Sequence, residues 1–396
     1  MSLARDGGAG LPAYQSARLA AVSDSETVAA SRRAQELRDQ GIDVISLTVG
    51  EPDFPTPPHV VEAAHRAAVA GQTRYVPVLG TKSLRASIAR KFERDNGLAF
   101  DPAGEIIVGT GGKQVVYNAF AVSLEAGDEV VIPAPHWVSY PAMVAMAGGV
   151  PRILHTDARQ GYIPAPEQIA GVLTPRTRWL VLNFPGNPTG AVASRTQLEA
   201  IAEVLRRWPQ VLVLSDEIYE HICFDGRRPV SLAQVAPDLR ERILVVNGVS
   251  KAYAMTGWRI GYGAGPAPLI KAMAKMQSQT TGGACSISQA AAEAALDGPQ
   301  DFLAERSRIF QQRRDAVIGW LRRTPALRPF AAQGAFYLLC EVLGMEAAQA
   351  EARLLEAGVA VVGGGAFGAP GHIRLSIATS HDNLERACGR IAAALD

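Results

Sequence analysis

The apolar run Ile243-Leu244-Val245-Val246 is followed directly by Asn247-Gly248-Val249-Ser250-Lys251, and Arg259 lies eight residues further on. The run has the composition of a buried strand, so Lys251 is predicted to lie in a loop at the end of that strand. A fixed, partly desolvated lysine close to another cation can reach its neutral form at physiological pH. The segment therefore favours a Schiff-base lysine, with Arg259 available to bind a phosphate.

Few other lysines compete for this role. Lys82 and Lys91 fall in a segment with helical periodicity, and Lys271 and Lys275 stand four residues apart in another. These four are expected to lie on solvated helix faces. Lys113 follows two glycines and opens a helix, so it remains a second candidate for chemistry.

From about residue 105, short apolar runs alternate with helical stretches. Five runs are expected to be strands: 105–108, 129–132, 179–182, 211–214 and 243–246. Runs of this kind imply burial on both faces, and their alternation with helices predicts an α/β fold with a mostly parallel sheet. Ligands of such sheets bind at the carboxyl ends of strands, where this chain has Asn183, Asp216 and Asn247.

The pattern changes near residue 300. A long arginine-rich helix over 301–323 precedes two strand-like runs, 334–339 and 371–376, with a helix between them. We expect a large domain over residues 61–300 and a smaller α+β domain over 301–396. Residues 14–60 are predicted to join the smaller domain, and residues 1–13 to form a disordered leader.

Composition excludes several classes of function. The chain has 396 residues and a formal net charge of +1, which gives no reason to expect a nucleic acid or a membrane as partner. No apolar run reaches the roughly 18 residues of a membrane helix, so we expect a cytoplasmic protein with a small substrate. Four scattered cysteines are expected to be buried thiols, and the dispersed histidines predict no metal site.

Gly109-Thr110-Gly111-Gly112-Lys113-Gln114 joins a predicted strand to a helix N-terminus. Free N–H groups and the helix dipole favour an anion there. The spacing departs from the dinucleotide fingerprint at Gln114, so a single small phosphate is the better interpretation. Arg259 would supply the countercharge.

Five further residues are candidates, and four of them have a plainer alternative. Asn187 lies in the rigid loop Asn183–Gly190 and could donate a hydrogen bond, or the loop could be a simple strand-to-helix turn. Asp216 could pair with a protonated pyridine nitrogen and Tyr219 with the adjacent phenolic oxygen, or Asp216 could cap a helix. Trp137 could lie on an aromatic ring or in the core. Arg374 could bind a carboxylate or form a structural ion pair.

Together these segments resemble the class I aminotransferases of the pyridoxal-phosphate fold-type-I group, in particular the bacterial aspartate aminotransferase branch. The likeness runs from about Ser25 to the C-terminus. It is carried by Val49–Phe54, Thr73-Arg74-Tyr75, Gly111–Gln114, Trp137–Tyr140, Asn187–Gly190, Ser215–Tyr219, Asn247–Tyr262 and Arg374-Leu375-Ser376.

The resemblance implies a pyridoxal 5'-phosphate (PLP) enzyme with a seven-stranded sheet in its large domain. Lys251 would form the Schiff base and shuttle the proton. The ring would be held by Asp216, Asn187, Tyr219 and Trp137, and the phosphate by Gly111, Gly112, Lys113, Arg259 and the Tyr75 of a second subunit in a homodimer. Arg374 would bind the substrate α-carboxylate, with Gly50, Trp137 and Asn187 alongside.

For substrates, the resemblance implies an amino acid and a 2-oxo acid, most directly aspartate with 2-oxoglutarate. Lys113, Ser25 and Thr27 would meet the distal carboxylate. Some relatives also accept prephenate and carry a Lys-Pro pair ahead of the Ser-x-Thr segment; Ser23-Asp24 stands there in this chain, which argues against prephenate. His136 and Phe184 also depart from the family pattern, and a specialised aminotransferase, lyase, cyclase or oxidase stays open as the alternative.

Overall fold

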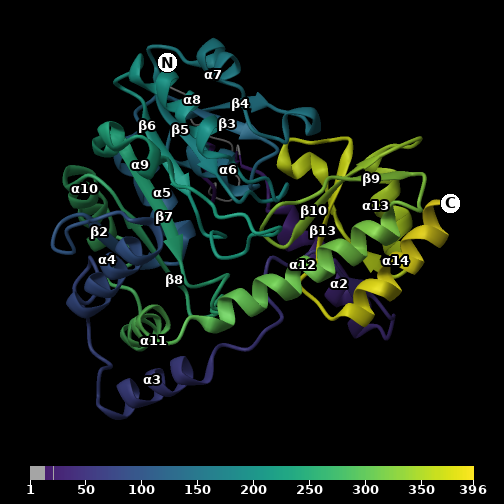
Figure 1. The fold of residues 1–396 in the computed structure, drawn as a ribbon, viewed down its shortest axis with the longest axis horizontal. Helices are drawn as coiled ribbons and strands as arrows, with labels where there is room; N and C mark the ends of the chain where they lie inside the picture. Colours follow the sequence, from purple (N-terminus) through teal and green to yellow (C-terminus); the bar gives the residue numbers. More distant parts are fainter. Residues whose placement is uncertain (1–13, 21) are drawn as a thin grey trace, which may run out of the picture.

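A seven-stranded sheet forms the centre of the larger part of the molecule (Figure 1). The computed structural model describes residues 14–20 and 22–396, so the predicted leader lies outside the described residues. The strand order is β2-β8-β7-β6-β5-β3-β4, and only β8 runs antiparallel to its neighbours. The strands are β2 (Ile106–Thr110), β3 (Glu129–Ala134), β4 (Val150–His155), β5 (Thr177–Asn183), β6 (Leu212–Asp216), β7 (Ile243–Gly248) and β8 (Ile260–Ala264). The predicted mostly parallel α/β sheet is confirmed.

Alternate side chains of each strand enter two separate hydrophobic cores. In β7, Ile243 and Val245 face one core, whereas Leu244 and Val246 face the other. This period of two explains why the strands are apolar throughout. One face is covered by α3 (Pro58–Val69), α4 (Lys82–Asn96), α7 (Pro166–Val172), α8 (Arg195–Arg206), α9 (Leu232–Val235) and α11 (Ser286–Asp297). The other is covered by α5 (Gly112–Ser123), α6 (Ser139–Met146) and α10 (Ala267–Ser278).

The rest of the chain builds two smaller sheets around a third core. The four-stranded antiparallel sheet has the order β12-β13-β10-β9, and β1 pairs in parallel with β11. The strands and helices of this part of the chain are β1 (Ile45–Ser46), β9 (Leu327–Pro329), β10 (Tyr337–Val342), β11 (Val359–Ala360), β12 (Val362–Gly363), β13 (His372–Ser376), α2 (Glu26–Asp39), α12 (Asp301–Leu321), α13 (Ala347–Glu356) and α14 (His381–Leu395). The remaining short helices are α1 (Ala17–Ala20), η1 (Ala158–Gln160), η2 (Pro237–Arg242) and η3 (Gly364–Phe367).

Helix α12 runs from the large sheet to the smaller sheets (Figure 1) and anchors the segment that follows β1. Arg313 donates two hydrogen bonds of 2.7 Å to the carboxylate of Asp53, and Phe310 packs edge-on against Phe54. Such a bidentate pair fixes orientation as well as distance. Gly50 is thereby held near the carboxyl ends of the large sheet. No helix in the described part of the chain is long and apolar enough to cross a membrane.

Candidate active site

A cavity of about 430 Å³ opens where the carboxyl ends of β5, β6 and β7 meet the smaller sheets. Most of the predicted site residues line it, although they come from distant parts of the sequence. They are Thr27, Gly50, Gly112, Lys113, Trp137, Asn187, Asp216, Tyr219, Lys251, Arg259 and Arg374. The cavity is also lined by Asn183, one of the polar strand ends expected near a ligand, and by residues for which the sequence predicted no role: Ser31, Thr48, Tyr140, Ser250 and Tyr337.

Lys251 lies three residues after the end of β7 and points into the cavity. Its Nζ donates a 2.6 Å hydrogen bond to the carbonyl oxygen of Gly50 and lies about 6 Å from the ring centres of Tyr219 and Phe336. The pKa of Lys251 is lowered to about 8, chiefly by burial and also by repulsion from Arg259 and Arg374, which together outweigh the attraction of Glu51. The amine is thus poised to act as a nucleophile or a base near neutral pH.

This lowered pKa predicts how the amine reacts. Between its folded value of about 8 and the ordinary lysine value of 10.5, Lys251 is neutral in the folded protein. Labelling of Lys251 by an amine-specific reagent, followed by mass spectrometry, should therefore increase with pH around a midpoint near 8. A midpoint above 10 would contradict the geometry described here.

The turn between β2 and α5 forms a polar part of the cavity wall. Gly111 has φ +83°, and the guanidinium of Arg259 packs so closely against it that a Cβ at this position would clash. Gly112 is the first residue of α5, so the free N–H groups of this helix start beside Arg259. Partial burial and the charge of Arg259 lower the pKa of Lys113, whose Nζ lies 5.1 Å from the ring centre of Trp137. Such an arrangement suits an anion with several oxygens.

Asp216 is the last residue of β6 and lines the same cavity. Its Oδ2 accepts a 2.6 Å hydrogen bond from the Tyr140 hydroxyl, and burial raises the pKa of Asp216. The next α-helix begins only at Leu232, so the alternative that Asp216 caps a helix is wrong. The Tyr219 hydroxyl lies 3.1 Å from that of Tyr337. The Asp216 carboxylate thus accepts from the Tyr140 hydroxyl and from the Ile218 N–H at 3.3 Å, and it could accept from a protonated nitrogen of a ligand as well.

Arg374 extends from β13 into the same cavity and is almost fully buried, with 2% of its surface exposed. It donates to the Thr48 carbonyl oxygen at 2.6 Å and to Asn187 Oδ1 at 3.1 Å, and it packs against the rings of Tyr337 and Phe367. Among the described residues, its Nε has no hydrogen-bond partner and no carboxylate pairs with it. The structural ion pair considered for Arg374 is therefore wrong. A buried, incompletely satisfied guanidinium indicates a site for an anionic ligand.

Comparison with known proteins identifies the family. A sequence model described as "Aminotransferase class I and II" matches residues 42–391. The chain belongs to this family. It is 48% identical to the aspartate/prephenate aminotransferase of Cereibacter sphaeroides, over 96% of this chain and 98% of the relative. It is 47% identical to the aspartate aminotransferase of Rhizobium meliloti, over 96% and 95% of the two chains.

Solved structures agree with this aminotransferase fold. The crystal structure of the aspartate aminotransferase from Rhizobium meliloti superposes with a TM-score of 0.94 at 46% identity, covering 98% of this chain and 99% of that chain. The aspartate aminotransferase from Thermus thermophilus with maleate gives 0.92 at 45% identity, covering 96% and 99%.

Three predicted residues of the aminotransferase lie at or beyond the edge of the cavity. Ser25 does not line it, but its hydroxyl lies 3.0 Å from that of Thr27, which does. Gly111 does not line the cavity either, but it lies in the turn before α5 and packs against the guanidinium of Arg259, which does. Tyr75 is fully exposed and does not line the cavity of its own chain.

Lys91 corrects one sequence-based prediction. It was expected on a solvated helix face, but its side chain is 1% exposed and pairs with the buried carboxylate of Glu220. Glu220 also accepts hydrogen bonds from Asn96 at 2.9 Å and Asn247 at 2.7 Å. Burial would raise the pKa of Glu220, but Lys91 and His221 outweigh it and lower the value to about 2.

The same cluster contains a grouping of possible metal ligands. Donor atoms of Asp95, Glu220 and His221 lie within 4.8 Å of one another. The Lys91 ammonium already occupies this position as the cation, since its Nζ also lies 3.9 Å from Asp95. We therefore interpret the cluster as a buried ion-pair network.

The cysteines also differ from prediction. Cys340 and Cys388 are buried, Cys223 is half-buried, and Cys285 is exposed where α11 begins. The expectation that all four are buried thiols is wrong for Cys285.

Proposed function

We propose that this aminotransferase binds PLP in the cavity and transfers the amino group between aspartate and 2-oxoglutarate, giving oxaloacetate and glutamate. The observation that carries the proposal is the buried, incompletely satisfied guanidinium of Arg374 in the same cavity as the Lys251 amine. A planar guanidinium matches the α-carboxylate of an amino acid, and a neutral amine is the base that transamination requires.

The residues present fit the cofactor. The start of α5 and Arg259 suit its phosphate, and Asp216, which has no cation within salt-bridge distance among the described residues, suits its ring nitrogen. Trp137 would contact the ring face, while Asn187 and Tyr219 would donate to the ring oxygen. Bound there, the cofactor would withdraw electrons from the substrate Cα.

The protein would supply orientation and proton transfer. Lys251 would carry the cofactor aldehyde and afterwards move the proton from the substrate Cα, because its Nζ has a lowered pKa and, among the described residues, no carboxylate within salt-bridge distance. Asp216 would keep the ring nitrogen protonated. Arg374 would hold the α-carboxylate, and Lys113, with Thr27 and Ser25, would face the distal carboxylate.

Two observations support a dicarboxylic substrate. Lys113 provides a second cation on the cavity wall, separate from Arg374. Relatives of this chain are named aspartate aminotransferases, and one solved relative is described with maleate, which is a dicarboxylate. The name of the Cereibacter sphaeroides relative makes prephenate a second candidate acceptor, although Ser23-Asp24 replaces the lysine expected for it.

We also propose a cytoplasmic homodimer in which the partner's Tyr75 completes the phosphate site. Its side chain is fully exposed in the single chain, which leaves it available to another subunit.

Replacement of Arg374 tests the carboxylate site. Arg374→Lys keeps the charge but loses the planar pair of donors, so kcat/KM for aspartate should fall by about 100-fold or more. Arg328→Lys, at an exposed position on β9, is the matched control and should leave kcat/KM unchanged. Equal values for the two variants would contradict the assignment.

The function itself is tested by single-turnover spectroscopy of the PLP-loaded protein with aspartate, glutamate, other amino acids and, in the reverse direction, oxaloacetate and prephenate. We expect the cofactor absorption to change with aspartate and glutamate and to return with their oxo acids. An unchanged spectrum with all acidic substrates would exclude the proposal. Release of ammonia or pyruvate without an oxo-acid acceptor would instead favour a lyase.

A further inference from the structure

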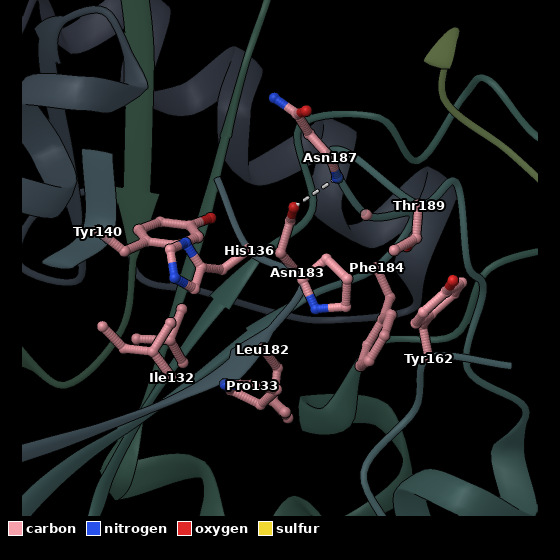
Figure 2. A pocket seen from close by; sticks show the side chains of 13 residues that line it. Ile132, Pro133, His136, Tyr140, Tyr162, Leu182, Asn183, Phe184, Asn187 and Thr189 are labelled. Carbon is pink, nitrogen blue, oxygen red and sulfur yellow. Dashed lines mark hydrogen bonds between the residues drawn. The ribbon is translucent and has the colours of Figure 1, made fainter. Parts of the chain in front are cut away.

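Asn183 ends β5 and lies beside Asp216 in the neighbouring strand. Its Oδ1 accepts a 2.9 Å hydrogen bond from the backbone N–H of Asn187, as the dashed line in Figure 2 shows. Its Nδ2 donates a 2.9 Å hydrogen bond to the backbone carbonyl oxygen of Asp216. One side-chain amide therefore joins the loop that carries Asn187 to the strand end that carries Asp216.

Among the described residues, no other side chain joins this loop to β6 through hydrogen bonds. A cavity of about 30 Å³ lies behind it, lined among others by His136, Tyr140, Phe184 and Asn183 (Figure 2). The N–H groups of Gly186 and Gly190 bond to Ala191 and within the loop, and the Gly190 carbonyl oxygen accepts from the N–H groups of Gln333 and Gly334, on the side away from β6. The amide of Asn183 is thus the polar tie between Asn187 and β6.

The hydrogen bonds continue beyond Asn187. Its side-chain Oδ1 accepts from Arg374, which leaves its Nδ2 free to donate toward the cavity. A displacement of the loop would therefore shift the Asn187 Nδ2, which is proposed to donate to the ring oxygen. It would also shift the Asn187 Oδ1, which accepts from Arg374. Such couplings through a shared network are non-additive.

We propose that Asn183 is a positioning residue that sets the distance between Asn187 and Asp216, so that both can contact one bound ring. This inference rests on the proposed function. Asparagine suits the position because one group must accept from an N–H and donate to a carbonyl oxygen at once. An aspartate lacks the donor, and a serine or threonine is too short to reach both partners.

The test measures the pH at which the PLP-loaded protein changes its absorption. Asn187, when correctly placed, favours the unprotonated form, so Asn183→Ser should raise this midpoint by about half a unit to one unit, the loss expected for one hydrogen bond. Asn183→Thr, which suits the end of a strand, is the second variant should the first fail to fold. PLP affinity, measured by equilibrium dialysis, should weaken in parallel.

A double variant separates positioning from general stability. If Asn183 acts through Asn187, adding N183S to Asn187→Ala should shift the midpoint no further. Asn118→Ser, which removes another buried amide that donates to Gln277, should lower thermal stability without moving the midpoint.

An unchanged midpoint in N183S and N183T, or additive shifts in the double variant, would overturn the inference while leaving the proposed function intact. A wild-type protein that binds no PLP would contradict the proposed function itself.

Discussion

Replacing Lys251 with alanine is expected to lower transamination by about four orders of magnitude or more, because a positioned general base alone contributes roughly 10²–10⁴-fold. The amine is also the group proposed to carry the cofactor. The rate should be measured with saturating PLP, aspartate and 2-oxoglutarate, with thermal unfolding recorded for the same preparation.

Lys271→Ala is the matched control, since this lysine is exposed on α10. It should retain full activity. A Lys251→Ala variant that keeps more than about 1% of wild-type activity while folding normally would reject the role of Lys251, because a loss below 10²-fold is smaller than a general base contributes.

Among the variants described here, Lys91→Met should lower the free energy of unfolding the most. Methionine fills a similar volume but leaves Glu220 buried without its cation, which costs about 3–5 kcal/mol when one partner of a buried pair is removed. The effect is measured as a shift of the urea unfolding midpoint at pH 7.

Two further variants make this prediction specific. Lys82→Met, exposed on the same helix, should change stability by no more than about 0.5 kcal/mol. The double variant K91M/Glu220→Gln should recover part of the loss, because no unpaired charge remains buried. If K91M and Lys82→Met unfold at the same urea concentration, the buried pair contributes nothing and the prediction is wrong.

Lys91 also illustrates where sequence reasoning fails. Leu84, Ile88 and Phe92 form the apolar stripe of α4, and Lys91 lies on that stripe by spacing. Its charge suggested an exposed position. The partner that makes burial possible, Glu220, lies more than a hundred residues away, and no local pattern connects the two.

The fold was predictable where strands are buried on both faces. The five predicted runs correspond to β2, β3, β5, β6 and β7. Two strands of the sheet were missed. β4 lies at the edge and alternates exposed with partly or fully buried residues, and β8 is rich in glycine, so neither has a continuous apolar signal.

The candidate site was predictable as a set of residues at strand ends, but not in its supporting contacts. Tyr140 and Tyr337 reach Asp216 and Tyr219 from different elements, so only tertiary structure brings them together. The sequence left open whether Arg374 pairs with a protein carboxylate. Its partners in the described part of the chain decide this: they are the Thr48 carbonyl oxygen, the Asn187 amide oxygen and two aromatic rings, with no carboxylate among them.

The central claim is that Lys251 binds PLP covalently. The most direct measurement is borohydride reduction of the purified protein after incubation with PLP, followed by peptide mapping of the modified lysine by mass spectrometry. We expect one reduced PLP adduct per chain, on Lys251. A protein that carries no adduct, or one on Lys113 or another lysine, would contradict the account.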